Sequence, residues 1–440
     1  MWKHSSSVTR SAASPVAGAV DWPVTSCAIS LPVACAYRTR TRTLSSKKSA
    51  TRRRKRYFSL RRKRGFRFPL REGNRLQFSA DADDWFDAAL ASIDAAQCYI
   101  LFEIYLISDG EITARFTRAL CTAAERGIAV HVLIDDYGGR GLGETTRRHL
   151  RTAGVQLRFY NPFRHWRWLA NLRRDHRKLL LVDGELAFVT GAGLTDDFSR
   201  RVSGEDWWRD TALCISGPVV TDCYQLFAES WRTTGGTLAV PLPADDVLTG
   251  GSVAQLLSAR PGYNEIARAL IRHVRRARQR IWLTTPYFVP TRKLQRALKH
   301  AARRGVEVRL LLPGDDNDHP WVSYAARGRY QRLLHHGVRI FEFQPGFTHA
   351  KMALIDDWAT AGSSNFDRWD QRWNLDANLA FSDGTCLGRM RDWFEENFAR
   401  CEEISLSAWQ RRPWHRRLKE WLARLLINLL ERIGRNRKRR

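Results

Sequence analysis

Apolar and polar residues follow one another along this chain in blocks that predict helices and strands in turn. Apolar residues recur at helical spacing in 85–97 and 112–126, and the run at 98–107 is apolar enough for a buried strand. The helix predicted at 112–126 ends at Gly127, a frequent C-terminal residue of helices, and a strand at 128–134 follows. This alternation predicts an α/β fold in which a mixed β-sheet is flanked by helices.

The same order of elements returns in the second half of the chain. The segment Ala301–Val308 echoes Ala123–Val130 at an offset of 178 residues. A repeat of this length indicates two duplicated domains related by a pseudo-twofold axis. We expect a first lobe at residues 72–235, a Gly- and Pro-containing linker at 236–252, and a second lobe at 253–405.

One polar motif also occurs twice, each time at the head of an apolar run. The two copies are His176-x-Lys178-x4-Asp183 and His349-x-Lys351-x4-Asp356. Residues two apart on a strand share a face, so each histidine and its lysine point the same way. Asp183 and Asp356 stand at odd spacing from their histidines, so we expect them to brace the fold more than to touch a substrate.

Two histidines and two lysines brought face to face make a site that can split a phosphodiester. A neutral imidazole can attack phosphorus, an imidazolium can protonate the leaving alcohol, and lysine charges can neutralise phosphoryl oxygens. One copy of the motif could equally be a core histidine beside a strand lysine. Two copies at identical spacing favour a catalytic pair.

The doubled motif resembles the signature of the phospholipase D superfamily. From about Glu72 to the C-terminus the chain further resembles the bacterial cardiolipin synthases in it, through Ile100–Tyr105, Pro286–Phe288, Gly362–Asp367 and Asn374–Asn378. The resemblance implies two phospholipase D-like lobes with the active site at their interface, a phosphohistidine intermediate, and no metal or cofactor. It also implies that His176 is the nucleophile and His349 the acid and base, although the sequence alone does not order the two.

Members of this superfamily also place an Asn or Ser after each motif and an acid near each histidine. The candidates in this chain are Asn365, Ser363 and Glu103 for contacts with substrate, and Asp210 and Asp376, which lie in matching strands, for orienting the histidines. The first copy departs from the family pattern at Gly193, where Asn is usual. The second copy is one residue shorter than usual between Asp356 and Gly362.

Positive charge is concentrated at the two ends of the chain. Of the formal net charge of +28, residues 38–71 carry +16 and residues 411–440 carry +10, whereas residues 72–410 carry +1. A nuclease that follows a phosphate backbone should carry its charge around the active site, so we expect no nucleic-acid partner. Basic ends on a nearly neutral core fit an anionic phospholipid membrane better.

The two ends differ in pattern. Residues 1–71 are rich in Ser, Thr and Arg and are predicted to be disordered; within them, 24–36 resembles a weak signal-peptide end but is too short to span a bilayer. Residues 406–440 are predicted to form a basic amphipathic helix on a membrane surface, with packing on the core as the alternative. Its apolar face consists of Leu418, Trp421, Leu422, Leu425, Leu426, Leu429, Leu430 and Ile433. The eight cysteines include no close pair, so we expect reduced thiols and no zinc site.

These features predict a phosphatidyltransferase of the cardiolipin-synthase type, which moves a phosphatidyl group from phosphatidylglycerol to a second phospholipid. The resemblance places it on the cytoplasmic face of a bacterial inner membrane as a peripheral protein. One alternative is a phospholipase D or other phosphodiesterase that uses water as the acceptor, and another is an inactive membrane-binding scaffold. The sequence leaves the identity of the two lipids and the oligomeric state open.

Overall fold

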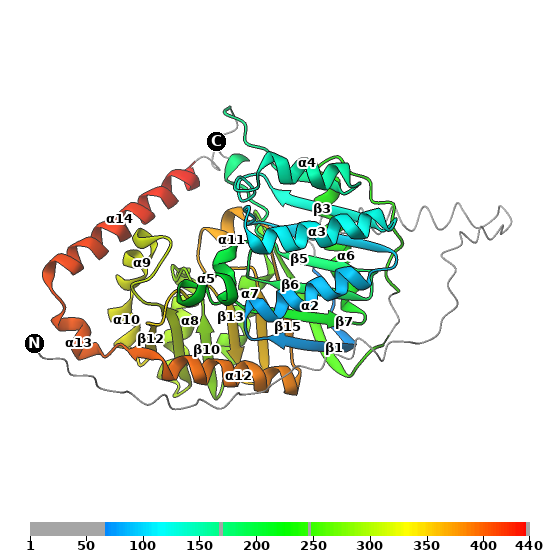
Figure 1. Ribbon diagram of the computed structural model, residues 1–440. Coiled ribbons are helices and arrows are strands. Elements are labelled where there is room, and N and C mark those ends of the chain that lie inside the picture. Colours follow the sequence, from blue (N-terminus) through cyan, green and yellow to red (C-terminus); the bar gives the residue numbers. More distant parts are fainter. Residues whose placement is uncertain (1–66, 167–169, 245–247, 437–440) are drawn as a thin grey trace, which may run out of the picture. The chain divides into compact units, whose positions relative to one another are not determined.

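The computed structural model describes residues 67–166, 170–244 and 248–436 (Figure 1). Residues 1–66 and 437–440 lie outside the described residues, so the disorder expected of residues 1–71 and the basic tail are not tested there. For residues 67–71 the expectation of disorder is wrong, because Phe68 is buried in the hydrophobic core and Arg71 begins a strand. Among the helices of the described segments, none is long and apolar enough to cross a membrane.

The first lobe alternates strands with helices in the order that the apolar pattern predicts. Its strands are β1 (Arg71–Ser79), β2 (Tyr99–Ile104), β3 (Ala129–Asp135), β4 (Gln156–Tyr160), β5 (Leu179–Val182), β6 (Leu186–Thr190) and β7 (Ala212–Ser216). Its helices are α2 (Ala82–Ala95), α3 (Glu111–Glu125), α4 (Glu144–Thr152), α5 (Arg200–Ser203) and α6 (Val219–Thr233). Short 3₁₀ turns lie at Ala170–Leu172, Asp196–Phe198 and Gly204–Asp206. The helices and strands expected between residues 85 and 134 are confirmed, with boundaries shifted by a few residues.

The second lobe repeats this order and then adds two helices. Its strands are β8 (Ser252–Arg260), β9 (Tyr263–Asn264), β10 (Arg280–Thr284), β11 (Glu307–Pro313), β12 (Arg339–Phe343), β13 (Met352–Ile355), β14 (Trp358–Gly362), β15 (Asp376–Phe381) and β16 (Cys401–Glu403). Its helices are α7 (Glu265–Arg276), α8 (Arg292–Arg303), α9 (Pro320–Arg327), α10 (Tyr330–Leu334), α11 (Asp370–Trp373) and α12 (Gly384–Ala399), followed by α13 (Leu406–Arg411) and α14 (Trp414–Asn436).

The strands of both lobes join into one mixed sheet of 16 strands across the described residues. The seam between the lobes is the antiparallel pair β1 and β8. Outward from this seam, the first lobe runs β1-β7-β6-β5-β2-β3-β4 and the second runs β8-β15-β14-β13-β10-β11-β12. The identical order on the two sides confirms the duplicated fold with a pseudo-twofold relation.

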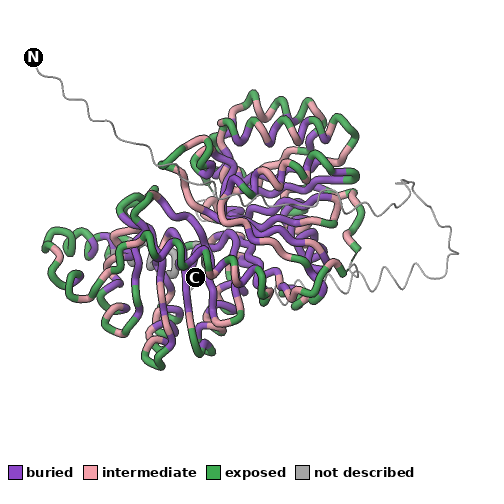
Figure 2. Tube along the Cα trace, turned by 60° about the horizontal axis from the view of Figure 1, so that its bottom comes forward, coloured by how far each residue is buried: buried purple, intermediate pink, exposed green. Residues whose placement is uncertain are grey.

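A hydrophobic cluster shared by the two lobes holds them together. It joins α6, through Phe227 and Trp231, to α12, through Met390 and Phe394, and to strand residues of both halves. The strands are largely buried, whereas the outer turns of the helices are exposed (Figure 2). The motif strands β5 and β13 are fully buried. Their burial holds the histidine and lysine that precede each strand at the lobe interface.

Helix α14 lies against the second lobe. It packs against α9, and Glu420 and Ala423 are buried there. On another side it exposes Leu418, Trp421, Leu422, Leu425 and Leu426. The predicted helix is therefore present and packs on the core, as the alternative expected, while an apolar surface stays exposed.

Candidate active site

A short backbone bridge ties the first motif to the second lobe. The N–H of His176 donates to the carbonyl of Leu375 at 2.9 Å, and the N–H of Leu375 donates to the carbonyl of Arg174 at 2.9 Å. Leu375 directly precedes Asp376, the first residue of β15. The bridge therefore sets His176 of the first lobe beside the acid of the second lobe.

The second motif is tied to the first lobe in the same way. The N–H of His349 donates to the carbonyl of Arg209 at 2.7 Å, and the N–H of Arg209 donates to the carbonyl of Phe347 at 2.9 Å. Arg209 directly precedes Asp210. Each histidine thus lies beside the acid of the opposite lobe, and the two halves of the site are built from crossed pairs.

In the first crossed pair, Nδ1 of His176 lies 3.0 Å from Oδ1 of Asp376. The same oxygen accepts a hydrogen bond from the hydroxyl of Ser363 at 3.1 Å. Burial raises the pKa of Asp376 to about 6, against the opposing charge of Lys178. When the carboxylate accepts from Nδ1–H, Nε2 of His176 is left as the nitrogen that can reach phosphorus.

In the second crossed pair, Nδ1 of His349 lies 2.7 Å from Oδ2 of Asp210. Nζ of Lys351 lies 3.2 Å from the same carboxylate oxygen and 2.7 Å from Nδ1 of His349. Burial, and then the charge of Lys351, lowers the pKa of His349 to about 4. Burial alone would raise the pKa of Asp210, but Lys351 and the hydrogen bond with His349 hold it below its usual value.

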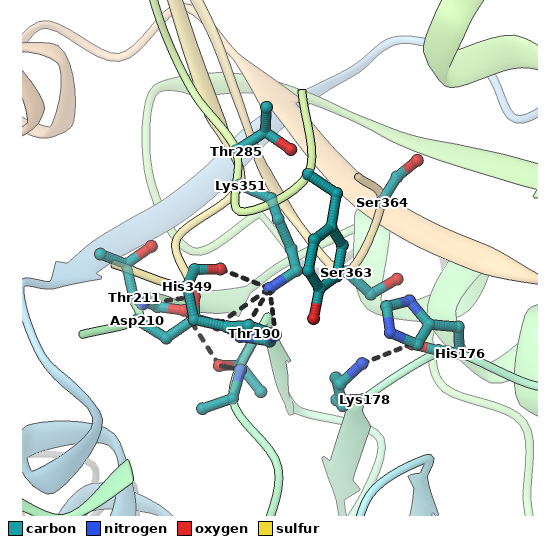
Figure 3. A network of polar contacts seen from close by, with 12 residues as sticks. His176, Lys178, Thr190, Asp210, Thr211, Thr285, His349, Lys351, Ser363 and Ser364 are labelled. Atoms are coloured by element: carbon teal, nitrogen blue, oxygen red, sulfur yellow. Dashed lines mark hydrogen bonds and ion pairs between the residues drawn. The ribbon is translucent and has the colours of Figure 1, made fainter. Parts of the chain in front are cut away.

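The two lysines are the buried positive charges of the site. Lys178 is 2% exposed; it donates to the carbonyl of His176 at 2.9 Å and stands 5.2 Å from the ring centroid of Tyr105. Lys351 is 0% exposed. Figure 3 shows both lysine side chains directed toward the space between His176 and His349, with Ser363 beside that space. Such charges can stabilise the oxygens of a phosphoryl group in transfer.

Tyr105 was not singled out from the sequence. Its ring packs edge-on to His176, with centroids 4.7 Å apart, and lies under the Lys178 ammonium. It lies within the strand predicted at 98–107, but the pairing of β2 with the motif strand β5, which brings it to the site, was not predicted. A tyrosine there restricts the rotation of the histidine ring by packing.

The motif aspartates contact backbone amides in turns. Asp183 accepts from the N–H groups of Gln97, Cys98 and Tyr99, and Asp356 accepts from those of Arg278, Gln279 and Arg280. Both have positive φ, 56° and 48°, immediately after a motif strand. Their bonds therefore fasten the end of each motif strand to the start of a neighbouring strand.

Glu103 lies apart from the two histidines. It is buried on β2, 3.5 Å from Nη1 of Arg177, which donates to Ser230 at 2.7 Å. Arg177 stands between His176 and Lys178 in the sequence and so faces the opposite side of the extended motif. The structure therefore does not bring Glu103 to the histidines. A role of Glu103 in binding substrate stays a prediction, and its observed partners do not support it.

The segment after β14 brings Ser363 and Asn365 to the site, where both are buried. Gly191 is the first-lobe counterpart of Ser363. Gly191 donates its N–H to the carbonyl of Thr211, which follows Asp210, and Ser363 donates its N–H to the carbonyl of Ala377, which follows Asp376. Gly193 is then the counterpart of Asn365. A Cβ added at Gly193 would lie 2.8 Å from the carbonyl oxygen of Leu106, so the backbone leaves no room for a side chain at this position.

Comparisons with known proteins point to one family. The family model described as cardiolipin synthase, PLD-like domain, matches residues 89–224 and 270–398, one stretch in each lobe. Cardiolipin synthase A of Pseudomonas fluorescens strain Pf-5 is 33% identical over 345 residues, which cover 77% of this chain and 71% of that protein. The probable cardiolipin synthase YwiE of Bacillus subtilis strain 168 is 28% identical over 360 residues, covering 80% of this chain and 71% of that protein.

Solved structures share the fold at low identity. The crystal structure of phosphatidylserine synthase from Haemophilus influenzae Rd KW20 superposes with a TM-score of 0.61 at 13% identity, covering 86% of this chain and 97% of that one. Polyphosphate kinase from Porphyromonas gingivalis gives a TM-score of 0.53 at 16% identity over 76% of this chain and 49% of that one. These likenesses concern the fold alone.

Proposed function

The chain belongs to the cardiolipin synthase, PLD-like family, and we propose that it transfers a phosphatidyl group from phosphatidylglycerol to a second phospholipid. The observation that carries the proposal is the pair of buried histidines, each held by an acid from the other lobe. One imidazole can bond to phosphorus while the other moves the proton, which is what a two-step exchange of alcohols on a phosphodiester needs.

In the first step, Nε2 of His176 attacks the phosphorus of phosphatidylglycerol and the bond to the glycerol oxygen breaks. The glycerol oxygen takes a proton from His349, and the phosphatidyl group stays on His176. In the empty site His349 is neutral at pH 7 because its pKa is about 4. The negative charge of a bound phosphodiester raises its affinity for the proton that it must donate.

In the second step, a hydroxyl of the acceptor lipid loses its proton to His349 and attacks the phosphohistidine. The phosphorus–nitrogen bond breaks, and His176 returns to its starting form. Lys178, Lys351 and Asn365 hold the phosphoryl oxygens in both steps through charge and hydrogen bonds. The burial of these groups limits water at the reacting phosphorus, which favours an alcohol as the acceptor.

We further propose that the protein lies as a peripheral protein on the cytoplasmic face of an anionic membrane. Among its described side chains, helix α14 exposes six large apolar ones, and Arg416, Arg417 and Lys419 are exposed at its start. An apolar face beside basic residues suits the boundary between headgroups and acyl chains.

A lipid assay tests the proposed reaction. The enzyme, purified in detergent, would be given labelled phosphatidylglycerol, with His176→Ala and His349→Ala beside it and the exposed His149→Ala as the matched control. We expect cardiolipin and glycerol from the wild type and the control only. Phosphatidic acid without cardiolipin would show that the protein is a hydrolase and not a transferase. No turnover of any phosphodiester would favour the inactive membrane-binding scaffold.

A further inference from the structure

A groove on the outer face of the second lobe carries a cluster of positive charge. It has a volume of about 900 Å³ and is lined by residues of α7 and α8, two helices that contact each other. Six of its basic residues come from these helices: Arg268, Arg272, Arg275, Arg276, Arg292 and Lys293. Among the described residues that line it, none is acidic. This groove is called the α7–α8 groove below.

Among these six helix residues, Arg272 and Arg268 contact groups that offset part of the charge. Arg272 lies 3.6 Å from the buried carboxylate of Glu265, and Arg268 stands 4.6 Å from the ring centroid of Tyr263. Arg276 and Lys293 are exposed at the surface of the groove. Like charges gathered in one groove repel each other, so an arrangement of this kind is stabilised by an anion.

The placement of two of these residues opposes the stability of their own helix. Arg292 and Lys293 occupy the first turn of α8, just after the N-cap Thr291. The N-terminus of a helix carries partial positive charge, so cations there are unfavourable and an anion is favourable. Arg275 and Arg276 lie in the last turn of α7, where the helix dipole favours them. The dipole therefore explains the basic end of α7 but not the basic start of α8.

The first lobe shows that the duplicated fold does not require this charge. The counterparts of α7 and α8 are α2 and α3, which together carry a net charge of −4, whereas α7 and α8 carry +8. Aspartates occupy the first turn of α2, at Asp83 and Asp84, and Glu111 occupies that of α3. The positive groove is thus a property of one lobe and not of the architecture.

The groove adjoins the segment that carries the candidate active site. Two further lining residues, Arg368 and Arg372, lie between Asn365 and Asp376 in the sequence. Arg368 is fixed by its N–H and its Nε, which donate to the carbonyls of Val289 and Pro290, each at 3.2 Å. An anion in the groove would therefore lie beside the loops that border the site.

We propose that the α7–α8 groove binds the phosphate headgroups of anionic phospholipids at a membrane surface. The inference deepens the proposed function, on which it rests, by giving the lipid surface a defined contact on the second lobe. A bilayer is favoured over a soluble phosphate because α14, which packs against α9 of the same lobe, exposes leucines and Trp421. Basic and apolar surfaces on one lobe suit headgroups and acyl chains together.

Vesicle binding tests the proposal with two matched double variants of the full chain. Arg276→Gln with Lys293→Gln removes two charges from the groove. Arg118→Gln with Arg148→Gln removes two exposed charges from α3 and α4 of the first lobe. Binding would be measured by sedimentation with vesicles of phosphatidylcholine alone, or of phosphatidylcholine with phosphatidylglycerol. The basic ends of the chain are the same in both variants, and thermal unfolding would check that both are folded.

We expect the groove variant to bind the anionic vesicles about 30-fold more weakly than the wild type, from the contribution of each Lys or Arg near such a surface. The first-lobe variant should bind within a few-fold of the wild type. Equal losses in both variants, or no loss in either, would overturn the proposal. Release of the wild type from the vesicles by inorganic phosphate at constant ionic strength would indicate that the groove binds a soluble phosphate and not a membrane. The readout is the fraction of protein bound and not a lipid product, so its failure leaves the lipid-transfer assay unaffected.

Discussion

The two crossed histidine–aspartate pairs have the same motif and the same backbone bridges but different surroundings. Asp376 accepts from Ser363 as well as from His176, and burial raises its pKa to about 6. Asp210 lies 3.2 Å from the Lys351 ammonium, and its pKa stays below the usual value. One pair therefore carries a weakly acidic carboxyl, and the other an ionised carboxylate matched to a buried cation.

One pair of counterpart residues beside the two acids also differs. Ser363 in the second lobe donates its hydroxyl to Asp376, but the first lobe has Gly191 at this position. A Cβ added at Gly191 would lie 2.4 Å from the Asp210 carboxylate, so the glycine lets that carboxylate approach the backbone. The Ser363 hydroxyl lowers the pKa of Asp376 without offsetting its burial, whereas Lys351 and His349 outweigh the burial of Asp210. Duplication thus supplies two equal frames, and the charges around each acid differ, so that the two histidines can take different roles.

The largest effect should come from separating the roles of the histidines. His349→Ala should still take up labelled phosphatidyl on His176, but uptake and release should both be slower than in the wild type by about 1,000-fold or more, since both steps lack the proton carrier. His176→Ala should take up none. The readout is label bound to the alkali-denatured protein. Label on His176→Ala but not on His349→Ala would reverse the assignment.

The next effect distinguishes the two acids through stability. Asp210→Asn leaves Lys351 buried without its carboxylate and should lower the free energy of unfolding by about 3–5 kcal/mol. Asp376→Asn should cost much less, because the pKa of Asp376 is already raised to about 6. Denaturant unfolding of both variants at neutral pH measures the difference. Equal losses would show that the two carboxyls are ionised alike.

A smaller effect should follow when the first lobe is given the family residue. Gly193→Asn places a Cβ against the Leu106 carbonyl, so we expect a loss of about 1–3 kcal/mol in stability and no gain in activity. Gly388→Ala on α12 is the control, because an added Cβ there meets nothing within 4 Å. A more active Gly193→Asn protein would mean that the backbone at Leu106 adjusts.

The smallest effect is a pair of opposite slopes in stability against pH. The pKa of His349 is lowered to about 4, so its contribution to stability is lost as pH falls from about 6.5 toward 4. The pKa of Asp376 is raised to about 6, so its contribution is present at low pH and lost as pH rises from 3.8 through 6. Asp376→Asn should therefore make the melting temperature rise more steeply with pH in this range. An unchanged slope would contradict the raised pKa.

The sequence predicted the elements whose pattern is local. The strand at 128–134 and the helix at 112–126 have strong periodicity, and the doubled motif located the histidines. The strands β1 and β8 at the seam were not predicted, because a segment such as Arg71–Ser79 is polar and is held by partners such as Asp222, which forms an ion pair with Arg71 at 2.7 Å. Local patterns carry no information about such distant pairing.

The sequence predicted which residues form the site better than it predicted how they are arranged. Asp210 and Asp376 were candidates to orient the histidines, and they lie against them, but the crossing between lobes depends on the backbone bridges at Leu375 and Arg209. Glu103 was chosen from the resemblance, and it lies against Arg177 instead. The charge of α7 and α8 was hidden by the near-neutral total of residues 72–410, since opposite charges on the two lobes cancel in the sum.

The crossed pairs have a consequence for the origin of the chain. In a single lobe, the histidine and the acid would come from separate strands and would each lack the partner that the other lobe provides here. An ancestor of one lobe could have completed the site only as a homodimer, with two identical pairs. Because the two lobes here are separate stretches of one chain, their sequences can differ, and Ser363 faces one acid while Gly191 lies beside the other.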